Sequence, residues 1–221
     1  MINLPKLKSK ICPNLIYRTN RHCMENFKII RSFYDHRPRL LQITQTRIIY
    51  ENSDVKNNRF TEIKRDEIIG LRHGIQFIKG FEFTIGRTYV IFIKKNDGKE
   101  LKIDFKLFYG RKLQKKHQLF CEIIDTLWKH YFSDLKNSLL EKYKNGESFE
   151  IAKVTVFANK ISFNKNEIFI SDLSLKRYHH YFVLYSKHKQ NNNKMLYYLE
   201  DDDAVILLEI LTEIIKKYDQ S

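Results

Sequence analysis

The chain contains few of the residues that interrupt or cross-link a fold. Its 221 residues include 7 glycines, 3 prolines and 3 cysteines. So little glycine and proline argues against a disordered or low-complexity protein. The cysteines, Cys12, Cys23 and Cys121, have neither the number nor the spacing of a disulfide framework or a zinc site. We therefore expect a globular protein of a reducing compartment, in the cytoplasm.

Long apolar runs are also missing. No stretch approaches the roughly 20 apolar residues that a membrane-spanning helix needs. The first residues, Met1 to Lys10, lack the apolar core and the small-residue cleavage site of a signal peptide. We expect no transmembrane segment, so any association with a membrane would be peripheral.

Motifs that carry chemistry are absent from the sequence. It shows no glycine-rich phosphate loop, no nucleophile elbow and no His and Cys residues at metal-ligand spacing. We therefore expect a protein that is not an enzyme, with no catalytic residues, no metal and no cofactor.

Positive charge is abundant and unevenly placed. The formal net charge is +14. Residues 1–50 hold ten Lys/Arg and two Asp/Glu, a difference of +8, whereas residues 151–221 hold ten and nine, a difference of +1. A basic surface attracts phosphates, either of nucleic acid or of anionic lipid head groups. The alternative is that the lysines are simply solvated.

The chain contains an internal repeat. The segment 121–131 resembles 208–218, and each has apolar residues at the spacing of an amphipathic helix. Ile43–Tyr50 likewise aligns with Val156–Phe163 without a gap. Each helix follows a run of strand-like segments, so the same β-then-α unit occurs twice. We predict an α+β protein with mainly antiparallel strands.

The expected strands of the first copy end at a long helix. Leu40–Tyr50 predicts a hairpin, and Phe81–Ile85, Tyr89–Ile93 and Leu101–Phe105 predict further strands. A helix from Leu113 to Lys144 follows, either unbroken or restarted at a capping Ser133. The second helix starts after the acidic residues 200–203, whose carboxylates we expect to complement its positive N-terminus.

This order of elements resembles the pleckstrin-homology (PH)-like superfold of bacterial type. The acid-aliphatic pairs Glu67-Ile68 and Asp172-Leu173 are similar to the short step before the middle strands of that family. The resemblance covers about Arg37 to Tyr131 and Phe149 to Tyr218, and it implies two β-roll or barrel units, each closed by its C-terminal amphipathic helix. The expected domains are a basic N-terminal segment 1–36, a first PH-like domain 37–146 and a second, shorter one 147–221.

The resemblance also implies candidate site residues. Many PH domains bind phosphoinositides through a Lys followed by Lys/Arg-x-Arg, and Lys28, Arg37 and Arg39 have that form. Residues two apart on an extended chain project to one face, so the two arginines are expected to clamp one phosphate. Arg47 on the following strand completes the candidate anion- or lipid-binding set.

We expect a binding or adaptor protein that docks on an anionic membrane surface through its basic N-terminal part. Two alternatives remain open. The same charge could serve a nucleic-acid-binding protein, or the units could be a scaffold for a protein partner.

Overall fold

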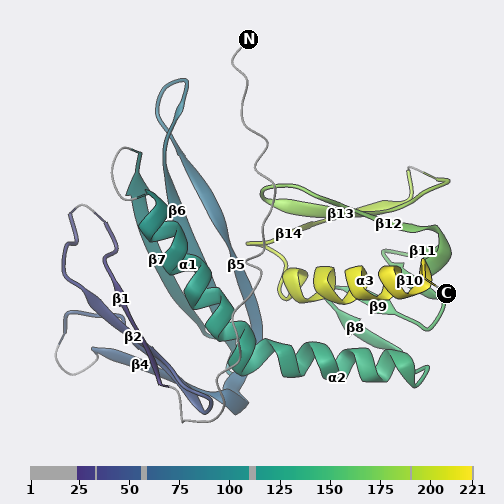
Figure 1. The fold of residues 1–221 in the computed structure, drawn as a ribbon, viewed down its shortest axis with the longest axis horizontal. Coiled ribbons are helices and arrows are strands. Elements are labelled where there is room, and N and C mark those ends of the chain that lie inside the picture. Colours follow the sequence, from purple (N-terminus) through teal and green to yellow (C-terminus); the bar gives the residue numbers. More distant parts are fainter. Residues whose placement is uncertain (1–23, 33, 56–58, 110–112, 190, 221) are drawn as a thin grey trace.

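The structure is a computed structural model that describes residues 24–220 except 33, 56–58, 110–112 and 190. It is an α+β fold with antiparallel strands in four small sheets, which confirms the predicted class. Figure 1 shows two β units, here called the N-terminal unit and the C-terminal unit, joined by helices α1 and α2. Cys12, Cys23 and residues 1–23 of the predicted basic segment lie outside the described residues.

The N-terminal unit contains two sheets that follow each other along the chain. Their strand orders are β1-β2-β3-β4 and β5-β6-β7, so sequence neighbours pair. The bounds are β1 Glu25–Ile29, β2 Arg39–Ile43, β3 Arg47–Glu51, β4 Phe60–Lys64, β5 Ile68–Lys79, β6 Thr84–Lys95 and β7 Glu100–Phe108. A short 3-10 helix, η2 (Arg65–Glu67), makes the step between the two sheets.

The C-terminal unit repeats this order in shorter strands. Its sheets are β8-β9-β10-β11 and β12-β13-β14. The bounds are β8 Phe149–Ile151, β9 Val154–Val156, β10 Lys160–Phe163, β11 Asn166–Phe169, β12 Leu173–Arg177, β13 Tyr181–Ser186 and β14 Asn193–Tyr197. The 3-10 helix η4 (Ile170–Asp172) lies between the sheets, and helix α3 (Ala204–Tyr218) ends the unit.

Strand register confirms the hairpin and its alignment with the second copy. Ile43 pairs with Ile48 in the N-terminal unit, and the aligned residues Val156 and Ile161 pair in the C-terminal unit. The step after each four-stranded sheet is also equivalent. The carbonyl of Glu67 accepts a hydrogen bond from the Asn96 N–H at 2.9 Å, and that of Asp172 accepts one from the Lys187 N–H at 2.8 Å.

The helical segment between the units is unbroken. Helix α1 (Leu113–Leu127), the π-helical segment η3 (Trp128–Phe132) and helix α2 (Ser133–Lys144) are continuous, and Ser133 has helical φ and ψ of −62° and −40° rather than a cap conformation. Figure 1 shows that the direction changes between α1 and α2. Interruptions of the regular helical ladder such as η3 are a common cause of such bends.

Each part of this helical segment packs on a different unit. The Phe120 ring of α1 lies 5.0 Å from the Tyr89 ring of β6. In α2 the Tyr143 hydroxyl donates a hydrogen bond to the Ala158 carbonyl of the C-terminal unit at 2.9 Å. Helix α2 therefore packs against the C-terminal unit, although by sequence it falls in the predicted domain 37–146.

The predicted strands Phe81–Ile85 and Tyr89–Ile93 are wrong as separate elements. The turn of the β5–β6 hairpin is closed by a hydrogen bond from the Gly80 N–H to the Phe83 carbonyl at 2.8 Å, and β6 then runs through Gly86. A Cβ at Gly86 would lie 2.3 Å from the Leu107 carbonyl oxygen. This glycine therefore permits close approach of β7 and does not end the strand.

Buried apolar side chains from both units form one continuous cluster. Helices α1 and α3 contribute equivalent residues, since Ile123 and Ile210 align in the repeat and both are 0% exposed. None of the helices in the described part of the chain is both long and apolar enough to cross a membrane.

We predict that Ile123→Ala and Ile210→Ala each lower the free energy of unfolding by about 2–5 kcal/mol, because each leaves a cavity in a close-packed core. Asn137→Ala on the exposed face of α2 is the control and should change it by less than about 0.5 kcal/mol. Urea titration followed by circular dichroism measures all three. If either isoleucine variant matched the control, the two helices would not close equivalent cores.

Candidate functional site

The structure brings together two of the four predicted anion-binding residues. Lys28 is exposed on the outer face of β1, whereas Arg39, opposite Ile29 in the sheet, is buried on the inner face. Arg47 lies at the turn end of β3, away from Arg39 at the start of β2. Its Nη1 lies 3.1 Å from Oε1 of Glu62 on the neighbouring strand. Lys28 and Arg47 are therefore apart from the arginine pair.

Arg37 and Arg39 do converge on one oxyanion, and it belongs to the protein. Nη1 of Arg37 lies 2.6 Å from Oδ1 of Asp54, and Nη2 of Arg39 lies 3.0 Å from Oδ2 of the same carboxylate. Arg39 also bonds to Asp35 at 3.1 Å and is 3% exposed. An external phosphate would have to displace Asp54 to occupy this clamp.

A buried carboxylate completes this group. Glu51 at the end of β3 is 3% exposed, accepts the Leu40 N–H at 3.0 Å and contacts Arg37 and Arg59. Desolvation alone would raise the pKa of Glu51. The Leu40 N–H and the two guanidinium groups outweigh desolvation and lower the pKa to about 2.

We call the six residues Asp35, Arg37, Arg39, Glu51, Asp54 and Arg59 the ion cluster. It holds three positive and three negative side chains, so its formal charge is zero. Sequence reasoning noticed the arginines and missed the acids. Asp54 and Glu51 lie 15 and 14 positions from their arginine partners, and only the pairing of β2 with β3 brings them close.

A second arrangement links the two units and was not predicted. Asp203, just before α3, makes two hydrogen bonds to Leu71 in β5. Its Oδ1 accepts the Leu71 N–H at 2.8 Å, and its own N–H donates to the Leu71 carbonyl at 3.2 Å. Asp203 has φ of 59° and makes no side-chain cap of α3. The expectation that this carboxylate complements the helix N-terminus is therefore wrong for Asp203, because the carboxylate bonds to β5 instead.

Contacts of the neighbouring residues Leu199 and Asp202 strengthen the attachment of Asp203 to the N-terminal unit. We call the contacts of residues 199–203 with β5 and β6 the junction. Asp202 lies 3.0 Å from Arg72 and 2.6 Å from Lys94. Leu199 packs so closely on β5 that a Cβ at Gly74 would lie 3.1 Å from its Cγ. His73, between Leu71 and Ile75, interrupts the alternation of apolar residues in β5, which is why this strand is missed by sequence reasoning.

Two hollows border the junction. One, of about 440 Å³, is lined by Ile69, Leu139 and acidic residues including Asp201. The other, of about 460 Å³, is lined by Gln76, Phe92, Tyr181 and the two histidines His179 and His180. Both histidine rings pack on Phe77 of β5, at 5.9 and 5.4 Å. Within the described residues there is no group of three or more His, Cys, Asp or Glu that could hold a metal ion.

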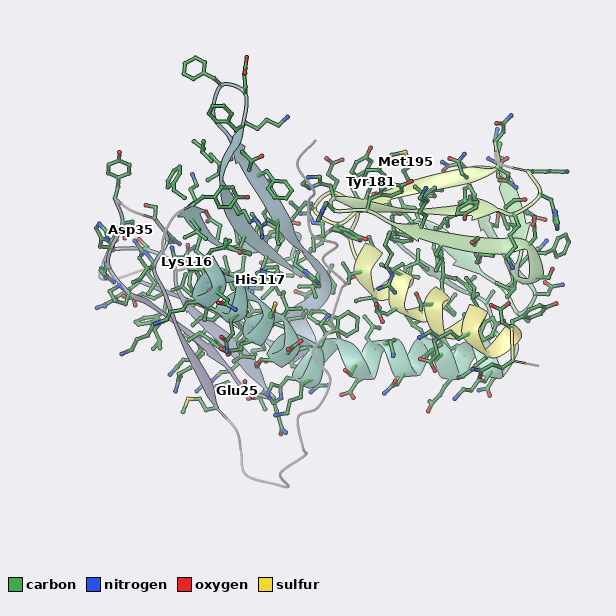
Figure 2. The ribbon with its side chains drawn as sticks, turned by 45° about the horizontal axis from the view of Figure 1, so that its top comes forward. Glu25, Asp35, Lys116, His117, Tyr181 and Met195 are labelled. Carbon is green, nitrogen blue, oxygen red and sulfur yellow. The ribbon has the colours of Figure 1, made fainter. Side chains whose placement is uncertain are left out.

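The free end of the β5–β6 hairpin exposes apolar side chains. Phe81 is 109% exposed and Phe83 70%. Ile85, Phe108 and Tyr109 at the same end of the sheet are 38%, 46% and 41% exposed. We call these five residues the apolar tip. Figure 2 shows this hairpin standing clear of the rest of the molecule, with ring side chains at its end.

Basic residues lie on the strands that lead to the apolar tip and on the first turn of α1. We call them the basic rim: Lys79, Arg87, Lys106, Lys115 and Lys116. The one acid at the hairpin end is Glu82, so the difference in formal charge is five minus one, or +4. Arg87 bonds to the Tyr109 hydroxyl at 3.1 Å, which joins rim and tip. Unlike the ion cluster, this end of the unit carries a positive excess.

We predict that Glu51→Gln lowers the free energy of unfolding at pH 7 by roughly 1–3 kcal/mol, because Arg37 and Arg59 lose their charged partner. The range allows for screening by water, since these arginines are 38% and 47% exposed. A depressed pKa gives stability that is complete above about pH 4.5 and is lost toward pH 2. The difference in free energy of unfolding between Glu51→Gln and wild type should therefore shrink as the pH falls from about 4.5 to 2. Glu62→Gln, in an exposed pair, is the control and should cost less than about 1 kcal/mol.

Asp203→Asn should raise the free energy of unfolding at pH 7, whereas Glu51→Gln lowers it. Burial raises the pKa of Asp203 to about 6, with a further rise from Asp202 that exceeds the effect of Lys94. A raised carboxyl pKa makes wild type lose stability as pH rises from about 4 to 6. The variant keeps an acceptor for the Leu71 N–H without the charge, so it should exceed wild type by roughly 1–3 kcal/mol at pH 7 and equal it at pH 4.

The difference between variant and wild type is the quantity to measure for Asp203, by urea titration at each pH. Burial of His73 lowers its pKa to about 4 and adds a slope of opposite sign to both proteins, which the difference removes. Asp219→Asn at the exposed end of α3 is the control. A difference that did not depend on pH would contradict the buried position of this carboxyl.

Comparison with known proteins adds no assignment to this geometry. No protein-family model matches the chain, and no curated protein sequence matches it. The function of this chain therefore has to be inferred from its own residues.

Proposed function

We propose that this protein is a non-enzymatic binding module that docks on anionic membrane surfaces through the basic rim. The observation that carries the proposal is the positive excess of +4 around an exposed apolar end of the N-terminal unit. Basic residues near an anionic bilayer each contribute about 1 kcal/mol of attraction. Lys79, Arg87, Lys106 and Lys115 together give useful affinity, whereas the Lys116 ammonium group donates hydrogen bonds to the Ile30 and Lys106 carbonyls.

The order of elements supports a tandem of PH-like units as the scaffold. Each unit has a four-stranded antiparallel sheet, a three-stranded sheet and a C-terminal helix, in that order. Several members of that family bind lipid head groups, so the resemblance favours the same class of ligand. The adaptor role follows from having two such units in one chain, with the C-terminal unit available for a protein partner.

The docking surface proposed here differs from the predicted arginine pair. Arg37 and Arg39 are bonded to carboxylates within a cluster of zero formal charge. The lysines of the rim, such as Lys79, Lys106 and Lys115, carry charge with no equivalent acidic cluster beside it. Lys28, exposed on β1, then supplies longer-range attraction, whereas Arg47 is paired with Glu62.

Nucleic acid remains the alternative for the same charge. Nucleic-acid binding weakens with salt, as adsorption to anionic lipid does, so salt dependence does not separate them. Direct competition between DNA and vesicles separates the two functions. A protein that docks on lipid should stay bound to vesicles when DNA of equal charge is added, whereas a nucleic-acid-binding protein should dissociate from them.

We predict that the full chain sediments with vesicles of phosphatidylcholine and phosphatidylserine and does not sediment with phosphatidylcholine alone. Lys79→Gln/Lys106→Gln/Lys115→Gln should weaken this binding roughly 10–100-fold, from the loss of three surface charges. The measurement is co-sedimentation across a lipid titration.

The matched control removes the same number of charges elsewhere. Lys142→Gln/Lys144→Gln/Lys216→Gln changes exposed lysines on α2 and α3 and should retain most of the affinity. Equal loss in both triple variants would mean that net charge alone drives adsorption. Absence of sedimentation, or displacement by DNA, would rule out the membrane proposal.

A further inference from the structure

We infer that the apolar tip inserts into the bilayer beneath the lipid head groups and so anchors the protein there. This inference rests on the proposed docking of the basic rim. It adds a second, apolar contact with the same partner, an anionic lipid surface, and assigns it to Phe81 and Phe83.

Exposure of the two phenylalanines is the first argument. At 109% and 70% exposed, Phe81 and Phe83 contribute almost nothing to the core. Phenyl rings bury a large apolar area when they find a partner, and exposed apolar patches commonly mark interaction sites. The fold itself does not require these side chains, since the turn is closed through the backbone of Gly80 and Phe83.

The shape of the hairpin end favours a bilayer over a folded protein as the partner. The tip is a narrow projection (Figure 2), not a groove. A folded partner would need a matching pocket and an interface of roughly 1,000 Å² or more to bind it specifically. A bilayer needs neither, because it offers a soft apolar phase under a negatively charged surface. The positive rim is complementary to that charge.

The distance between rim and tip lets the phenyl rings pass the head-group layer while the basic rim stays outside it. Strands rise about 3.3 Å per residue, so Arg87 lies about 10 Å along β6 from Thr84 at the base of the turn. The head-group layer is roughly 5–7 Å thick on each side. With the phenyl rings at the boundary of the acyl chains, Arg87 and the Tyr109 hydroxyl that it contacts lie just outside the head-group layer, where the guanidinium group faces the negatively charged surface.

Backbone hydrogen bonding limits the depth. Polar backbone groups must be satisfied wherever water is excluded. The hairpin pairs its strands from Lys79 and Thr84 inward, and the Tyr109 N–H bonds to the Ile85 carbonyl at 2.9 Å. Glu82 at the turn carries a charge that opposes burial. Shallow insertion of the two rings satisfies these constraints, and deeper insertion does not.

The test uses Phe81→Trp in a Trp128→Phe background, because Trp128 is the single native tryptophan. With phosphatidylserine-containing vesicles we expect a blue shift of the emission and quenching by lipids brominated on the acyl chain. Phe169→Trp in the same background, 57% exposed on β11 of the C-terminal unit, is the control and should show neither change.

Affinity supplies the second measurement. Phe81→Ser/Phe83→Ser should bind vesicles at least about tenfold more weakly, and the binding that remains should vanish in high salt, whereas wild type keeps part of its binding there. Glu82→Gln should bind several-fold more tightly. Circular dichroism checks that each variant is folded, which is expected for such exposed positions.

The outcomes separate this inference from the proposal on which it rests. Binding without a blue shift or bromine quenching would overturn insertion and leave electrostatic docking intact. No binding by any variant would overturn both. A blue shift without vesicles that grows with protein concentration would show that a second copy of the chain covers the tip, which would also overturn insertion.

Discussion

Two hydrogen bonds between Asp203 and Leu71 fix how the two units meet. They engage both backbone groups of one residue in β5, as an added strand would, but one of the two partners is a side chain. Leu199 and Asp202 pack beside them on the same strand. Because this contact lies directly before α3, the helix that closes the C-terminal unit starts from a residue held by the other unit. The junction is therefore adjacent in sequence to the buried residues of α3.

Charge in this protein divides into a balanced and an unbalanced part. In the ion cluster, three arginines and three acids neutralise one another around the buried Glu51. Such a group specifies how the loops after β1 and β3 meet, since removing one partner leaves a costly charge. At the hairpin end the basic side chains outnumber the single Glu82. This end of the N-terminal unit therefore presents a positive excess to a negatively charged surface.

Structural features that depend on residues close together in the sequence can be predicted from it, and features that depend on distant residues cannot. Helix periodicity and the Leu40–Tyr50 hairpin are local patterns, and both are confirmed by the structure. Strand β5 is missed because His73 interrupts its apolar alternation. The close approach of Leu199 to Gly74 joins residues 125 positions apart. The acids of the ion cluster and the contact of Asp203 with β5 likewise depend on pairings that no local window contains. The apolar tip is misread because its alternating residues are also typical of a half-buried strand.

The π-helical segment η3 has a consequence for how one helix can serve two units. An α-helix turns by about 100° per residue, so each extra residue accommodated in a wider turn rotates everything after it by that angle. The buried face of α1 meets the N-terminal unit through Phe120 and Ile123, and that of α2 meets the C-terminal unit through Leu140 and Tyr143. The phase offset introduced at Trp128–Phe132 gives a single helical segment two differently directed apolar faces. Shortening that segment by one residue would redirect α2, and with it the orientation of the whole C-terminal unit.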